Sequence, residues 1–151
     1  MTPPGISPAI FTPTRILIHH SASDDTPVDN TRWIRAWHKG QGWIDLGYHA
    51  TAEQIDGEYE ILVGRRWDLY GAHSYSQNKI ALGLCLIGNF SKAEPPRAQL
   101  VAAAKFVAFW MSLYNIPITE IYPHSKFDAT ECPGTLFPWD NFIELVRVAS
   151  A

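Results

Sequence analysis

The sequence has little of what defines several large classes of protein. It contains only two cysteines in 151 residues, too few for a disulfide framework. Its 12 lysines and arginines are outnumbered by 15 acidic residues, and a net charge of −3 offers no basic surface for nucleic acid. No apolar run is long enough to cross a membrane, and there are no internal repeats. We therefore expect neither a nucleic acid nor a membrane as partner.

The composition is that of one folded domain. Hydrophobic residues make up 46% of the chain and aromatic residues 13%, which is enough for a substantial core. Four prolines among residues 1–14 predict an irregular N-terminal arm, followed by a single domain at residues 15–151. The first residues lack the basic region and apolar stretch of a signal peptide. We therefore expect synthesis in the cytoplasm without a signal peptide.

Apolar runs and turn signals predict an α/β fold. Strands are expected at residues 15–20, 50–55, 58–63, 80–87 and 116–122, the last at an edge of the sheet. Asp56-Gly57 joins the second and third strands as a hairpin. Helices are expected at residues 29–39, from Pro96 to about Tyr114, and from Pro138 onward. The prediction is a single domain with a central mixed sheet of about five strands flanked by helices.

Helical spacing also predicts which side chains share a face. Trp33, Ile34 and Trp37 should line one face of the first helix. In the long helix, the residues expected to face the sheet are Leu100, Val101, Ala104, Val107, Ala108 and Met111. Cys85 lies in an apolar strand and is interpreted as a buried thiol. Arg65-Arg66 is expected on a solvated surface or as a local contact to substrate.

The segment from Pro123 to Gly134 carries the clearest chemistry. His124 and Cys132 are both good zinc ligands, and seven residues separate them. This gap suits a loop that leaves a strand with one ligand and returns with the other, ending in the turn Pro133-Gly134. Two ligands do not make a zinc site, so at least one more must come from elsewhere in the chain.

The first strand ends in two histidines that can supply the missing ligand. Successive strand residues point to opposite faces, so only one of His19 and His20 can reach the site. Three protein ligands with an open position are typical of catalytic zinc, whereas structural zinc sites have four.

Several segments together resemble the zinc-dependent type 2 N-acetylmuramoyl-L-alanine amidases. This family includes phage lysozyme-type endolysins and peptidoglycan recognition proteins. The matching segments are residues 18–22, 37–39 with 42–43, 47–49, 71–73, 86–90 and 124–133. The resemblance implies the fold of that family and one Zn²⁺ per chain. It also implies that His19 is the third ligand beside His124 and Cys132, with His20 in a supporting or core position.

The resemblance also assigns roles around the metal. It places Tyr48 near the metal, and Thr130 where many phage members carry a lysine. The Thr130 hydroxyl can donate a hydrogen bond to an oxyanion but brings no positive charge. His73 resembles a position lining the substrate groove, and His49 is expected beside it as a second substrate-binding residue. No residue stands out as the general acid, and Asp128 and Glu131 are interpreted as facing solvent.

The function that the resemblance implies is zinc-dependent hydrolysis of the amide between N-acetylmuramic acid and L-alanine. The expected partner is peptidoglycan or a muropeptide, and the expected state is a monomer. The enzyme would act on the cell wall after release, or on imported wall fragments.

Two alternatives remain open at the level of sequence. One is a peptidoglycan-binding module that does not cleave, because some recognition proteins of this family lack the zinc-binding cysteine. The other is a cysteine hydrolase with Cys132 as nucleophile and a histidine as base. Both are less favoured, since Cys132 is present and accompanies two ligand-type histidines.

Overall fold

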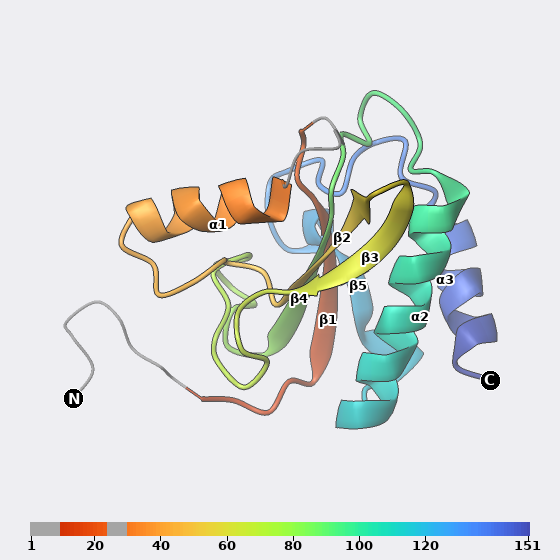
Figure 1. The fold of residues 1–151 in the computed structure, drawn as a ribbon. Coiled ribbons are helices and arrows are strands. Elements are labelled where there is room, and N and C mark those ends of the chain that lie inside the picture. Colours follow the sequence, from red (N-terminus) through yellow and green to blue (C-terminus); the bar gives the residue numbers. More distant parts are fainter. Residues whose placement is uncertain (1–9, 24–29) are drawn as a thin grey trace.

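The computed structural model describes residues 10–23 and 30–151, and within them a five-stranded mixed sheet forms the centre of the molecule (Figure 1). The strands are β1 (Arg15–His20), β2 (Ala50–Ile55), β3 (Glu58–Val63), β4 (Ala81–Leu86) and β5 (Ile121–Pro123). Their order is β3-β2-β4-β1-β5, with only β3 antiparallel to its neighbour. The predicted mixed sheet of about five strands is confirmed. Most of the expected N-terminal arm, residues 1–9, lies outside the described residues.

In the described part of the chain, three α-helices flank the sheet: α1 (Asn30–Gly40), α2 (Arg97–Tyr114) and α3 (Trp139–Ala149). Figure 1 shows α2 and α3 side by side on one side of the sheet, with α1 on the other. Two short 3-10 helices, Ile118–Glu120 and His124–Lys126, flank β5. The last strand is therefore shorter than predicted, because part of residues 116–122 forms the first of these turns after Pro117.

The core lies between the sheet and the helices α2 and α3. All residues of β4, and all residues of β1 except Arg15, are buried, and the large rings of Trp110 and Phe142 fill the space against them. The buried face of α2 comprises Gln99, Leu100, Ala103, Ala104, Val107 and Trp110. It is turned slightly from the predicted stripe, because burying the Trp110 indole brings that residue inward and leaves Met111 only partly buried.

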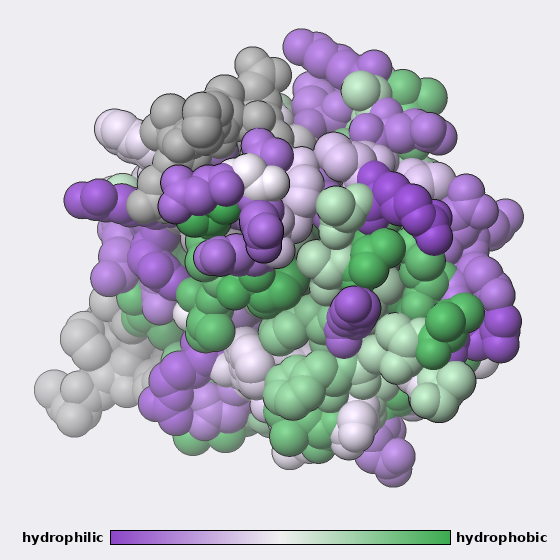
Figure 2. Space-filling view, turned by 45° about the vertical axis from the view of Figure 1, so that its right-hand side comes forward, coloured by the Kyte–Doolittle hydropathy of each residue, from purple (hydrophilic) through white to green (hydrophobic). Residues whose placement is uncertain are grey.

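The surface on the α2 side of the molecule includes exposed apolar side chains, seen as green atoms among hydrophilic ones in Figure 2. Phe109 and Leu113, one helical turn apart on α2, are 49% and 51% exposed. Within the described part of the chain, no helix has the length and apolar character needed to span a bilayer.

A buried arginine organises the loops around β2. Arg65 donates hydrogen bonds to the carbonyl oxygens of Asp45, Leu46 and Tyr70, at 3.2, 2.9 and 2.8 Å. The expectation of a solvated or substrate-contacting Arg65 is therefore wrong, because its side chain is buried and its donors are taken up by three backbone carbonyl groups. Its hydrogen bonds hold the segment that leads into Tyr48.

Candidate metal centre

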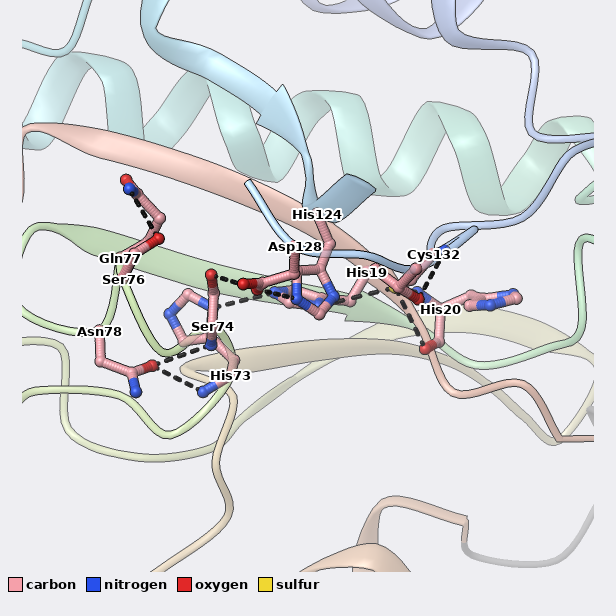
Figure 3. Close-up of polar contacts among 11 residues, drawn as sticks. His19, His20, His73, Ser74, Ser76, Gln77, Asn78, His124, Asp128 and Cys132 are labelled. Atoms are coloured by element: carbon pink, nitrogen blue, oxygen red, sulfur yellow. Dashed lines mark hydrogen bonds and ion pairs between the residues drawn. The ribbon is translucent and has the colours of Figure 1, made fainter. Parts of the chain in front are cut away.

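His19, His124 and Cys132 meet at one edge of the sheet. His19 lies near the end of β1, and His124 directly follows β5. These strands are parallel neighbours, so their carboxyl ends lie at the same edge. One ligand atom from each of the three residues lies within 4.8 Å of the others, and His19 Nδ1 is 3.7 Å from Cys132 Sγ (Figure 3). The chain thus brings together the three residues singled out as ligands.

The loop between the second and third ligands closes on itself. The Ser125 N–H donates to the Cys132 carbonyl at 2.9 Å, and the Cys132 N–H donates to Thr130 Oγ1 at 3.2 Å. Gly134 then packs against the backbone of Phe90 so tightly that a Cβ atom would lie 2.3 Å from the Phe90 carbonyl carbon. Only glycine fits there, and this contact fixes where the loop returns.

A chain of hydrogen bonds sets the tautomer of His19. His73 Nε2 lies 3.0 Å from the Ala81 carbonyl, which can only accept, so this nitrogen carries the proton. In the neutral ring His73 Nδ1 is then an acceptor, and it lies 2.9 Å from His19 Nε2. His19 Nε2 therefore donates to His73. The lone pair of His19 Nδ1 is left facing Cys132, where a metal can use it.

His124 is oriented in the same way by a carboxylate. Its Nε2 lies 2.5 Å from Asp128 Oδ2, which also accepts a hydrogen bond from Ser74 Oγ at 2.7 Å (Figure 3). The Ser74 hydrogen bond, and then His124, lower the pKa of Asp128 and keep it charged. The interpretation of Asp128 as solvent-facing is wrong. The sequence signal for this contact is the spacing of four residues, which places His124 and Asp128 side by side when the segment forms a helical turn.

Burial controls the protonation of the ligands. It lowers the pKa of His19 well below the ordinary value, with help from His73 and His124, so this imidazole is neutral. Burial also raises the pKa of the Cys132 thiol to about 11, which outweighs a hydrogen bond from the His20 N–H. The thiol therefore carries its proton at neutral pH in the absence of a cation. Metal binding would release that proton, which makes affinity rise with pH.

The donor set fits zinc. Two imidazole nitrogens and one thiolate are preferred zinc ligands, and three protein ligands leave a fourth position for water or substrate. The partners of both imidazoles, His73 and Asp128, are of the kind that orient metal-binding histidines. Calcium and magnesium, which prefer oxygen ligands, do not suit this set.

The three residues lie in a groove of about 620 Å³. Tyr48 is in its wall, with its ring centroid 5.1 Å from that of His19. Burial, with further contributions from Cys85 and Cys132, raises the pKa of Tyr48 well above its usual value, so its hydroxyl keeps its proton. The groove is lined by His19, His20, Ala22, His38, Trp43, Tyr48, Ala72, His73, Ser74, Tyr75, Asn78, His124, Asp128, Thr130 and Cys132.

Thr130, His73 and His49 differ in their access to the groove. Thr130 is exposed at its rim, and its oxygen accepts from the Cys132 N–H, which leaves its own hydrogen for donation. His73 lines the groove, but both its ring nitrogens are used within the protein. His49 is fully buried outside the groove lining, bonded to the Gly83 N–H and the Leu69 carbonyl. This position argues against the expected contact between His49 and substrate.

His73 gives a direct test of the tautomer argument. Replacing it with alanine removes the acceptor for His19 Nε2, and we expect metal affinity to fall about 10- to 100-fold. Competition with a chromogenic chelator would measure the dissociation constant, and circular dichroism would check the fold. Glutamine can still accept from His19 and donate to Ala81, so His73→Gln should recover part of the affinity. Unchanged affinity in His73→Ala would contradict the proposed relay.

A family model described as N-acetylmuramoyl-L-alanine amidase matches residues 11–135. The endolysin of Enterobacteria phage K11 is 36% identical over 143 residues, covering 88% of this chain and 89% of that protein. The endolysin of Klebsiella phage KP32 is 38% identical over 90 residues, 60% of this chain. That match spans only 58% of the phage protein.

Solved structures agree over nearly the whole chain. The N-acetylmuramoyl-L-alanine amidase LysC from Clostridium intestinale URNW superposes with a TM-score of 0.79 at 30% identity, covering 91% of this chain and 87% of that one. Drosophila PGRP-LB, solved as a mutant in complex with tracheal cytotoxin, has a TM-score of 0.77 at 26% identity. The match covers 93% of this chain and 86% of the Drosophila chain. The fold expected from the resemblance is confirmed.

Proposed function

The chain belongs to the N-acetylmuramoyl-L-alanine amidase family, and on that basis we propose that it hydrolyses the amide between N-acetylmuramic acid and L-alanine in peptidoglycan. One zinc ion, held by His19, His124 and Cys132, is the proposed cofactor. The observation that carries the proposal is the convergence of these three ligand atoms in the floor of a groove. The substrate class is supported by the phage endolysins and by a structural neighbour solved with tracheal cytotoxin.

When bound, zinc would supply a Lewis acid that polarises the scissile carbonyl and lowers the pKa of water. The chain's own residues prepare the rest of the reaction. His73 and Asp128 hold the two ligand imidazoles in the tautomer that leaves Nδ1 free. The protonated Tyr48 hydroxyl, which also interacts with Cys85, is the proposed donor to the carbonyl oxygen as negative charge develops on it.

Thr130 is the second proposed donor. Its hydroxyl hydrogen is not needed by the Cys132 N–H, which donates to the same oxygen atom. A neutral donor strengthens its hydrogen bond as the carbonyl oxygen becomes charged, although it offers less than a lysine would. The groove walls orient the stem peptide, and the wall polymer or its fragments are the proposed partners.

The site disfavours a cysteine hydrolase. A cysteine nucleophile reacts as the thiolate, and its pKa is normally lowered in such enzymes. Burial raises the pKa of Cys132 to about 11 instead, and its sulfur faces a ligand-type nitrogen of His19. A module that only binds peptidoglycan would have no need for two imidazoles oriented toward one thiol.

The bond that is cut provides the test of the proposed function. Digestion of purified peptidoglycan should release new L-alanine amino termini with no increase in reducing sugar. Labelling of free amino groups followed by mass spectrometry would identify the new terminus, and a reducing-end assay would monitor the glycan. A chelator should stop the release, and added zinc should restore it.

Other products would overturn the proposal. New reducing ends without new amino groups would indicate a glycosidase. New amino termini on another residue would indicate a hydrolase that cuts within the stem peptide and not at the proposed bond. Activity of a zinc-free preparation that the chelator does not affect would instead support a cysteine hydrolase with Cys132 as nucleophile.

A further inference from the structure

The outer face of α1 carries two tryptophans in solvent. Trp33 and Trp37 are 69% and 66% exposed. Their spacing of four residues places them one turn apart on the same side of the helix. We call Trp33 and Trp37 the α1 tryptophan pair. Large apolar side chains that gather on a surface typically mark a site of interaction.

The pair is not needed to hold α1 on the protein. The helix packs through its other side, where Thr31 and His38 are buried. Glu53 of β2 accepts hydrogen bonds from the N–H groups of Asn30 and Thr31, at 2.5 and 3.1 Å. A carboxylate at a helix N-terminus also interacts favourably with the helix dipole. The fold therefore anchors α1 by one side and presents two indoles on another.

A row of aromatic rings connects Trp37, the second member of the pair, to the groove. The ring centroid of Trp37 lies 5.4 Å from that of His38, and His38 lies 4.5 Å from Trp43. His38 and Trp43 both line the groove that contains the ligand residues. His38 is buried between the two indoles, so a polymer whose reacting unit occupies the groove would pass from Trp43, which is 36% exposed, to Trp37 on the outer face of α1.

The chemistry of this face suits a glycan strand. Indole rings offer flat apolar faces with one polar N–H, which match sugar rings that are apolar on their faces and polar at their edges. α1 contains no acidic residue, and Arg32 and Lys39 are exposed on it. Their positive charge favours a polymer whose attached peptides carry carboxylates.

We propose that the α1 tryptophan pair is a secondary binding surface for the glycan strand of peptidoglycan. It makes the enzyme favour the polymeric wall over small muropeptides. The inference rests on the proposed function, because that function places peptidoglycan in the adjoining groove.

The test compares two matched double variants of the full chain. Trp33→Ala with Trp37→Ala removes the pair, and Phe109→Ala with Leu113→Ala removes an exposed pair of the same spacing on α2. The first probe is a soluble oligomer of N-acetylglucosamine, which lacks stem peptides and so cannot be cut at the proposed bond. Calorimetric titration would measure its binding. Thermal unfolding would confirm that both double variants are folded. If the α1 double variant does not fold, the single variants Trp33→Ala and Trp37→Ala take its place.

We expect the α1 double variant to bind the oligomer at least about tenfold more weakly, as is typical when interface tryptophans are truncated, with the α2 variant unchanged. Its loss of activity on insoluble peptidoglycan should exceed its loss on a soluble muramyl peptide. Equal binding by the parent and the α1 variant would overturn the proposal. So would binding through the pair to phosphatidylglycerol vesicles but not to the oligomer. Binding of the oligomer by a protein that cuts neither substrate would support the surface and refute the proposed function.

Discussion

Replacing Cys132 with alanine is expected to remove the metal and abolish hydrolysis while leaving the fold intact. The core of the protein lies between the sheet and helices α2 and α3, and its hydrophobic cluster includes none of the three ligand residues. Loss of a Lewis acid worth several kcal/mol corresponds to at least about a thousand-fold in rate. Metal analysis would give the zinc content, and release of L-alanine amino termini would give the activity.

The stability of the Cys132→Ala variant gives a second measurement. Metal binding adds to the free energy of folding, so the variant should unfold at a lower temperature than the zinc-loaded protein. It should match the parent protein treated with a chelator. The control is Cys85→Ala, which removes the other free thiol but no ligand, and should keep its zinc. Full zinc occupancy in Cys132→Ala would refute the ligand assignment.

Replacing Tyr48 with phenylalanine is expected to lower the rate about a hundred- to a thousand-fold, the usual cost of losing one oxyanion donor. The ring still packs beside His19, so zinc content and unfolding temperature should change little. The loss should fall on kcat more than on KM, because the hydrogen bond strengthens only as charge develops. Burial raises the pKa of Tyr48 well above its usual value, so its titration should not affect activity near neutral pH.

The matched control for Tyr48→Phe is Tyr114→Phe on α2, which removes a hydroxyl far in sequence and structure from the groove lining. It should leave the rate unchanged. A Tyr48→Phe variant that retains most of its activity with zinc bound would show that Tyr48 supports the groove wall and does not donate to the reaction.

Local sequence features predicted most of the framework. The apolar runs at residues 15–20, 50–55 and 58–63 coincide with β1, β2 and β3. The hairpin at Asp56-Gly57 has positive φ angles at both residues, 50° and 84°, as its sequence predicts. These features depend on neighbours along the chain, so no tertiary information is needed to predict them.

Features that depend on distant partners were missed or misread. Trp33 and Trp37 share a helix face as the spacing predicts, but the spacing does not tell that this face is exposed. Arg65 belongs to a charged pair in the sequence, and only the approach of three carbonyl groups makes it a buried structural residue. Asp128 has the sequence context of a solvated residue, and only the folded loop turns it toward His124 and Ser74.

The sequence by itself determined the α/β class, the ligand types and the family, because periodicity, turn residues and motif spacing are properties of the local sequence. Only the tertiary structure decided which ring nitrogen of each ligand histidine is free to bind a metal. His19 and His73 are 54 residues apart in the sequence. Their hydrogen bond exists only because the loop that precedes β4 packs against β1. The tautomer of a histidine follows from the partner of its other nitrogen, and that partner is set by packing between strands and loops, which no local pattern encodes.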